Sequence, residues 1–156
     1  MAADIKELVC KSRGELILFH LLDEDEVGKI IPYMEAVDYP KGATVFREGD
    51  PADFVGFISY GHLEVKKQTE FKDKQIVVAI LGKGSFVGEL SLADRRQPRS
   101  TTVEALENSE LIILRHEALE TIIDKYPHIA IKILKGLNQV LVIRLRKAVE
   151  RLAAVF

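Results

Sequence analysis

The chain of 156 residues is 47% hydrophobic and 29% charged, with a formal net charge of −2 at pH 7 and a pI of about 6.1. This length and composition suit a single domain with a packed core. The charge balance gives no basic footprint for nucleic acid, so we expect no direct DNA binding. One cysteine excludes an internal disulfide and fits a reducing compartment. No signal peptide opens the chain and no apolar run reaches membrane-spanning length, so we expect a cytoplasmic protein without membrane contact.

Residues 1–35 are predicted to form a helical segment, because their apolar residues recur mostly at helical spacing. Gly14 is expected to interrupt the first helical stretch. Asp23 is an N-cap candidate, and Glu26 follows three residues later as in a capping box. Pro32 is expected to distort the end of the helix that begins there.

Residues 36–115 change to short apolar runs separated by turn residues, a pattern typical of an antiparallel sandwich or barrel. The runs 54–59 and 63–68 are expected to pair as a hairpin around the tight turn at Tyr60-Gly61. The other predicted strands cover residues 43–47, 75–81, 101–105 and 110–114.

Residues 116–156 are predicted to return to helix, with a break at Tyr126-Pro127 between a short helix and a long one. The long helix carries an a/d pattern with Asn138 at an a position, which favours two strands. The pattern comprises Ile131, Leu134, Asn138, Leu141, Leu145, Ala148, Leu152 and Val155. A second apolar set could face the strands: Ile133, Leu137 and Val140. We expect a homodimer through residues 129–155; the alternative is a wide face that packs within the chain.

The most informative stretch is residues 85–105, SFVGELSLADRRQPRSTTVEA. Gly88 has no Cβ, so the backbone there can approach a ligand closely. Glu89, Leu90 and Ser91 suit a short helical turn whose first amides have no intrahelical acceptor and favour an anionic oxygen.

Arg99 adds a planar, permanently charged fork that matches a phosphate, and the hydroxyls of Ser100 and Thr101 can donate to the same oxygens. The Glu89 carboxylate only accepts hydrogen bonds, which suits a sugar hydroxyl. These residues predict a site for a small ligand that carries both phosphate and ribose. The alternative is a surface ion pair between Glu89 and Arg99, which would contribute little.

This stretch resembles the phosphate-binding cassette of the cyclic nucleotide-binding domain family, whose pattern is F-x-G-E-[LI]-[SAG]-L, a short turn, and R-[SAT]-[AT]-x-V. The matching residues are Phe86, Gly88, Glu89, Leu90, Ser91, Leu92, Pro98, Arg99, Ser100, Thr101 and Val103. The resemblance extends over residues 19–152. It implies an α+β chain, mainly β, in which an antiparallel double-sheet jelly roll (β-roll) stands between N-terminal helices and a long C-terminal helix.

By the same resemblance Glu89 would bind the ribose 2′-hydroxyl, Arg99 the cyclic phosphate, and Ser100 the phosphate or the base. In the catabolite activator group of the family a Thr-Ser pair on the long helix reads the adenine. Ungapped spacing from Arg99 puts Arg144 and Leu145 at these positions. An arginine can stack on a purine or donate to its acceptors, but it cannot replace a hydroxyl. Ser100 favours cAMP over cGMP in this family.

The expected role is a regulatory sensor domain that binds cAMP, with cGMP as the other candidate. It would signal by a movement of the C-terminal helix about Tyr126-Pro127 to a protein partner or to an effector domain outside this sequence. The alternative is a dimeric protein-interaction module of the same fold with a vestigial, ligand-free pocket. The four histidines stand too far apart for a metal site, and no base accompanies the hydroxyls of Ser100-Thr101-Thr102. We therefore expect no enzyme activity, no metal and no cofactor beyond the regulatory nucleotide.

Overall fold

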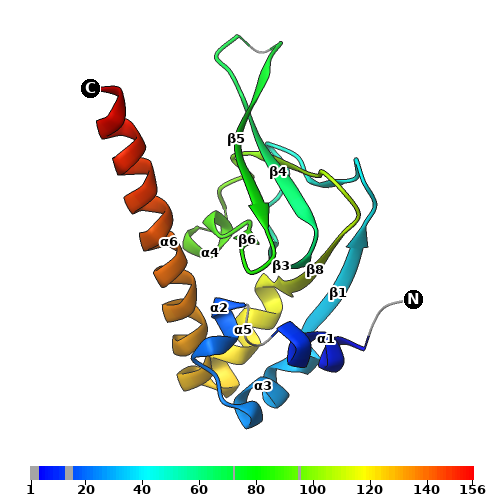
Figure 1. Cartoon of the computed structure of the whole chain (residues 1–156). Coiled ribbons are helices and arrows are strands. Elements are labelled where there is room, and N and C mark those ends of the chain that lie inside the picture. Colours follow the sequence, from blue (N-terminus) through cyan, green and yellow to red (C-terminus); the bar gives the residue numbers. More distant parts are fainter. Residues whose placement is uncertain (1–3, 13–15, 72, 95) are drawn as a thin grey trace.

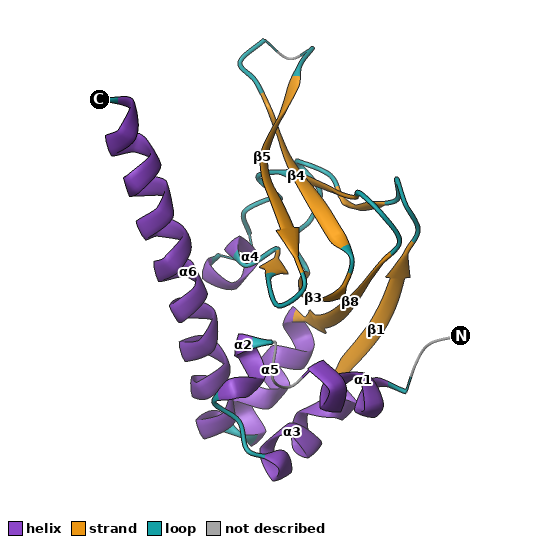
Figure 2. Cartoon of the chain, in the orientation of Figure 1, coloured by secondary structure: helices purple, strands orange, loops and turns teal. Residues whose placement is uncertain are grey.

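Two four-stranded antiparallel sheets lie face to face, and the helices gather at one end and along one side of them (Figure 1, Figure 2). The computed structural model describes residues 4–12, 16–71, 73–94 and 96–156. Sheet A has the strand order β1-β8-β3-β6 and sheet B the order β2-β7-β4-β5. The strands are β1 (Met34–Tyr39), β2 (Thr44–Phe46), β3 (Phe54–Tyr60), β4 (His62–Gln68), β5 (Gln75–Gly82), β6 (Phe86–Val87), β7 (Thr102–Ala105) and β8 (Ser109–Arg115). The predicted double-sheet jelly roll is confirmed.

Helices cover 42% of the residues and strands 31%, so the chain is α+β. The helices are α1 (Ile5–Ser12), α2 (Ile17–His20), α3 (Glu24–Ile30), the 3-10 helix η1 (Ile31–Tyr33), α4 (Leu90–Ala93), α5 (His116–Lys125) and α6 (Pro127–Val155). Gly14, expected to interrupt the first helical stretch, lies outside the described residues. No helix within the described ranges combines the length and the apolarity needed to cross a lipid bilayer.

Helix α3 begins with the predicted capping box. The Asp23 carboxylate accepts a hydrogen bond from the Glu26 amide at 2.8 Å, and the Glu26 carboxylate accepts one from the Asp23 amide at 3.1 Å. Pro32 lies in η1, the 3-10 turn that ends the helix, as its position predicted. Strand β1 begins at Met34, directly after η1, and was not predicted.

The predicted hairpin between residues 54–59 and 63–68 is wrong. Strand β3 pairs with β8 and β6 in sheet A, whereas β4 pairs with β5 and β7 in sheet B. Gly61 alone separates β3 from β4, so the chain passes from one sheet to the other at this residue. Its φ of +85° and the contact that a Cβ would make with Ser109 favour glycine there. The hairpin partner of β4 is β5, and the two form an arm that projects from the body of the chain (Figure 1).

The other predicted strands are confirmed to within one residue at each end as β2, β5, β7 and β8. Strand β6 was not predicted, because two residues are too few to show a period. It lies inside the 85–105 stretch and pairs with β3, which fixes the start of that stretch to sheet A.

Sheet A is the middle layer of the fold, because its two faces pack against different partners. In β8, Leu111 and Ile113 belong to the core between the two sheets, whereas Ile112 and Leu114 belong to the core beneath the helices. All four side chains are buried, which explains the unbroken apolar run of this strand. The helices contribute further buried side chains to the second core, including Phe19, Ile30, Ile122, Ile129 and Ile133.

Helix α6 has one side that is buried in its early turns and another that is apolar but exposed. Its early turns are buried on the side that includes Ile133 and Leu137, and Val140 is half-buried on the same side, as predicted. The a/d residues are instead exposed: Ile131 53%, Leu134 42%, Leu141 38%, Leu145 67%, Leu152 62% and Val155 79%. This apolar face therefore does not pack within the chain, which removes that alternative.

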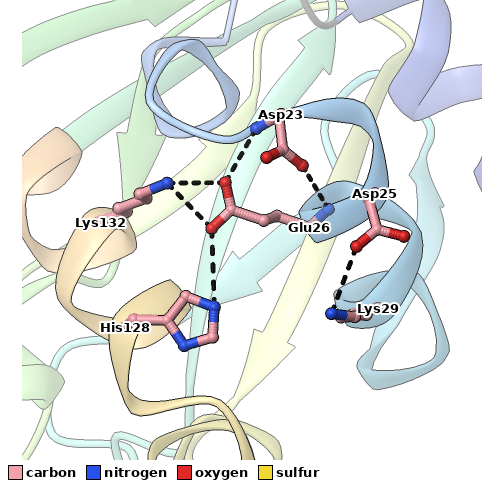
Figure 3. Close-up of polar contacts among 6 residues, drawn as sticks. All are labelled: Asp23, Asp25, Glu26, Lys29, His128 and Lys132. Carbon is pink, nitrogen blue, oxygen red and sulfur yellow. Dashed lines mark hydrogen bonds and ion pairs between the residues drawn. The ribbon is translucent and has the colours of Figure 1, made fainter.

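A buried polar contact joins α3 to the start of α6 (Figure 3). Lys132 Nζ donates to both carboxylate oxygens of Glu26 at 2.7 and 2.9 Å, and Nε2 of His128 lies 3.9 Å from the same carboxylate. The Glu26 side chain is only 6% exposed. The hydrogen bond from Lys132, followed by that from the Asp23 amide, lowers the pKa of Glu26. The carboxylate is therefore held in its ionised form.

Candidate functional site

A cavity of about 690 Å³ lies between sheet B, the 85–105 stretch and α6. Sheet B contributes apolar walls that include Val65, Ile80 and Leu81, and Val140 and Ile143 face them from α6. The predicted site residues that line the cavity are Gly88, Glu89, Leu90, Arg99, Ser100, Thr101 and Arg144. Ser91 lies in α4, and its side chain is outside the described part of the chain. The fold thus brings together residues that lie 55 positions apart, as from Glu89 to Arg144.

Arg99 is buried, with 4% of its surface exposed. Its Nη2 donates to the Phe54 carbonyl at 2.8 Å, and its Nη1 donates to the Gly88 carbonyl at 3.3 Å. The guanidinium lies 4.1 Å from the ring centre of Phe46 and 4.7 Å from that of Phe54, within cation–π range. The alternative of a surface ion pair between Glu89 and Arg99 is therefore wrong.

The Nε–H group of Arg99 is buried and has no acceptor among the described residues. Burial lowers the pKa of Arg99, while nearby carboxylates, Asp53 first, raise it. The Asp53 carboxylate is 3.8 Å from Nη2, beyond the distance of a hydrogen bond. An arginine stays protonated in proteins, so the site holds a buried cation with an unused donor. Buried charges in proteins are usually paired and buried donors hydrogen-bonded, so this group is suited to bind an anionic acceptor.

Gly88 is required for this arrangement. Its φ is +83°, a conformation that residues with a side chain rarely adopt. A Cβ at this position would lie 2.6 Å from Arg99 Nη1 and 2.8 Å from the Phe54 carbonyl oxygen. The absence of a side chain at Gly88 therefore lets the arginine reach both carbonyls.

Glu89 pairs with Arg144, which crosses the cavity from α6. Arg144 Nη1 donates to Glu89 Oε1 at 3.2 Å, and Nη2 donates to Ser85 Oγ at 2.5 Å and to the Phe86 carbonyl at 2.7 Å. The guanidinium also lies 4.4 Å from the ring centre of Phe86. Burial lowers the pKa of Arg144, and Glu89 raises it. Glu89 and Arg144 thus form a link between the 85–105 stretch and α6.

Four residues that line the cavity were not among the predicted site residues: Ser85 and Phe86 of the predicted cassette, and Lys147 and Arg151 of α6. Lys147 and Arg151 follow Arg144 at intervals of three and four, so they share its side of the helix. That spacing is visible in the sequence and could have identified them. Ser85 and Phe86 open the 85–105 stretch, and Phe86 matches the cassette pattern, but their contacts with Arg144 depend on where α6 packs.

No group of three or more histidine, cysteine, aspartate or glutamate side chains that could hold a metal ion occurs in the described ranges. The polar side chains of the cavity are instead cations, hydroxyls, the Gln97 amide and one carboxylate. This donor set suits an organic anion with hydroxyl groups.

The family profile of the cyclic nucleotide-binding domain matches residues 36–126. A Thermus thermophilus protein named cyclic AMP receptor protein is 31% identical over 131 residues, which are 84% of this chain and 58% of that protein. A Rhodopseudomonas palustris protein that carries the name of a potassium channel is 34% identical over 116 residues, 74% of this chain and 27% of that protein. The chain therefore spans only part of the length of these relatives.

The crystal structure of a cyclic nucleotide-binding domain from Methylobacillus flagellatus superposes with a TM-score of 0.85 and 27% sequence identity. The superposition covers 99% of this chain and 86% of that one. The family profile, the double-sheet fold and the cassette residues in the cavity all indicate the same family. This chain belongs to the cyclic nucleotide-binding domain family.

Proposed function

We propose that this chain is a regulatory domain that binds cAMP in the cavity between sheet B and α6. The observation that carries the proposal is the buried guanidinium of Arg99, whose Nε–H has no acceptor among the described residues. A cyclic phosphate would supply both the negative charge and the acceptor. The role is one of binding rather than catalysis, and the single cysteine is in keeping with the cytoplasm.

The other groups divide the rest of the ligand between them. The hydroxyls of Ser100 and Thr101 would add donors to the phosphate, and the Glu89 carboxylate would accept from the ribose 2′-hydroxyl. The base would lie between the apolar walls, with Arg144 over its face or at its acceptors. Ser100 and the name of the Thermus relative support adenine over guanine.

Ligand binding would be transmitted through the link between Glu89 and Arg144. In the structure Arg144 already uses the carboxylate that the ribose would need. A ligand that takes over Glu89 would release Arg144 to the base, and α6 would then shift about Tyr126-Pro127. Such a shift requires that the two helix positions differ in ligand affinity. The output would go to a protein partner or to a further domain, and not directly to DNA.

The exposed a/d face of α6 supports a homodimer through residues 129–155. Large apolar side chains on this face are 38% to 79% exposed, and Asn138 lies in the same series. A second copy of the helix would bury them in a two-stranded coiled coil, whose register a polar residue at an a position specifies. Ligand-driven movement of α6 would then change the arrangement of the two helices in the dimer, and with it the surface available to a protein partner.

The test is thermal unfolding with cAMP, cGMP and 2′-deoxy-cAMP, each added separately. A ligand at about 100 times its dissociation constant stabilises the native chain by about 2.7 kcal/mol. We expect the largest increase in Tm with cAMP, a smaller one with cGMP, and a reduced one with 2′-deoxy-cAMP, which lacks the hydroxyl for Glu89. In Glu89→Ala, which removes the acceptor for the 2′-hydroxyl, cAMP and 2′-deoxy-cAMP should have similar effects.

Arg99→Gln should abolish the increase in Tm, whereas Arg96→Gln should keep it, because the Arg96 side chain is 92% exposed and lies outside the cavity. Circular dichroism at low temperature establishes that Arg99→Gln is folded before ligand is added. If Arg99→Gln unfolds, the comparison of cAMP with 2′-deoxy-cAMP in the parent and in Glu89→Ala tests the proposal instead. Equal stabilisation of the parent and a folded Arg99→Gln by cAMP would contradict the proposal.

A second candidate is a dimeric interaction module with a vestigial pocket. It is favoured by one observation: Arg144 forms an ion pair with Glu89, so the carboxylate already has a partner within the chain. This function predicts that no cyclic nucleotide raises Tm, while the chain still forms a dimer. Arg144→Gln separates the two candidates further, because it releases Glu89. In a working pocket, the difference between the increases in Tm caused by cAMP and by 2′-deoxy-cAMP should then become larger. In a vestigial pocket, neither nucleotide should raise Tm.

A further inference from the structure

The cavity carries more positive charge than a cyclic mononucleotide can neutralise. The charged residues that line it are Arg99, Arg144, Lys147, Arg151 and Glu89, four cations and one carboxylate, which leaves a formal charge of +3. The chain as a whole has a net charge of −2, so this excess is local. Glu89 pairs with Arg144, and one ligand phosphate would neutralise Arg99. Lys147 and Arg151 are the two cations that remain.

These two side chains lie on the side of α6 that changes from buried apolar residues to basic residues along the helix. Ile133 and Leu137 on this side are buried against the rest of the chain, and further along it the residues become basic. Arg144, Lys147 and Arg151 recur at steps of three and four and span about 10 Å along the helix axis. The basic residues therefore begin where the helix leaves the core and lines the cavity.

Neither Lys147 nor Arg151 forms an ion pair with another side chain in the part of the molecule that the structure describes. Both are exposed, so each would add a modest, salt-sensitive attraction to an anion at the cavity mouth. At about 690 Å³ the cavity has the size of pockets that take drug-sized ligands. There is thus room and charge for a second phosphate.

We propose that Lys147 and Arg151 form a second phosphate subsite, so that the cavity also accepts a cyclic dinucleotide. Its first phosphate lies at Arg99 and its second between Lys147 and Arg151. This proposal rests on the proposed function, because it uses the same phosphate site at Arg99. Cyclic di-AMP, which has the adenine that we assign to the first site, is the probe.

The experiment compares the dissociation constants of cyclic di-AMP and cAMP by calorimetry in the parent and in two double variants. In Lys147→Gln with Arg151→Gln, cyclic di-AMP should bind about tenfold more weakly, from two exposed charge contacts, while cAMP changes less than about twofold. Lys135→Gln with Arg146→Gln is the matched control. It removes the same charge from exposed positions of α6 that do not line the cavity, and it should leave both affinities unchanged.

Cyclic di-AMP should also displace cAMP, and its affinity should fall more steeply with added salt than that of cAMP. An equal loss for both ligands in the cavity-side variant, or an equal loss in both double variants, would overturn the proposal. So would an increase in the Tm of the ligand-free chain by inorganic pyrophosphate as large as that given by cyclic di-AMP, because the subsite would then bind free anions. If cAMP binds and cyclic di-AMP does not, the subsite alone is refuted; if neither binds, the proposed function fails as well.

Discussion

The most specific packing requirement at the scale of single residues is that between Gly88 and Arg99. Gly88→Ala would place a Cβ 2.8 Å from the Phe54 carbonyl oxygen, which belongs to the backbone of β3 and cannot move freely. It would also strain a residue at a φ of +83°. We expect the free energy of unfolding to fall by about 2–4 kcal/mol, measured by urea denaturation, because overpacking adds to the backbone strain.

The matched control is Gly42→Ala. Gly42 has a φ of +85°, but a Cβ there would meet no atom within 4 Å. It should therefore show only the strain of a positive φ, about 1–2 kcal/mol. Equal losses in the two variants would mean that Arg99 does not depend on the absence of a side chain at Gly88.

The sequence predicted the chemistry of Arg99 but not its surroundings. Its charge and its spacing from Glu89 are local features, and both pointed to a phosphate site. Its stacking on Phe46 and Phe54 joins residues 45 or more positions apart, which no local pattern reveals. The same holds for the partner of Glu89, which proved to be Arg144 of a distant helix.

At the scale of secondary-structure elements, the contact between α3 and α6 gives a prediction about pH. Lys132→Met keeps most of the length and apolar contact of the side chain but removes the cation that pairs with the buried Glu26 carboxylate. At neutral pH we expect a lower urea midpoint than in the parent. Lys135→Met is the control, because Lys135 is exposed on the same helix and should change the midpoint little.

The difference between Lys132→Met and the parent should disappear as the pH is lowered. The pKa of Glu26 lies below its ordinary value of 4.5 in the folded chain, so the contact stabilises the fold above that value. The stabilisation is lost as the pH falls through the folded pKa, because the carboxylate then takes up a proton. A midpoint difference that stays constant well below pH 4.5 would show that the ion pair is not its cause.

Element types were predicted well where the pattern was long, as in β5, β8, α5 and α6. The failed hairpin shows the limit of local patterns. Two apolar runs with a glycine between them are typical of both a hairpin and a change of sheet, because both need a sharp turn. The choice at Gly61 was decided by β8 and β7, which pair with β3 and β4 from more than 35 residues further along the chain.

At the scale of the whole molecule, the exposed face of α6 predicts self-association. Leu141→Asp places a charge at a d position of this face and should convert the dimer to a monomer in analytical ultracentrifugation. Ile143→Asp makes a comparable change two residues away, on the side that lines the cavity, and should leave the dimer intact. A parent chain that sediments as a monomer at high concentration would refute the dimer directly.

The position of β8 in the middle of sheet A also sets the order in which the chain can fold. Among the strands that the structure describes, β1 has β8 as its one neighbour, and Met34 pairs with Leu114 across an interval of 80 residues. On the ribosome, β1 must therefore wait, with its edge unpaired, until β8 has emerged 80 residues later. Contacts of such sequence separation slow folding, and unpaired edges invite aggregation. Sheet B, whose β4–β5 hairpin closes locally, can begin to form much earlier in synthesis.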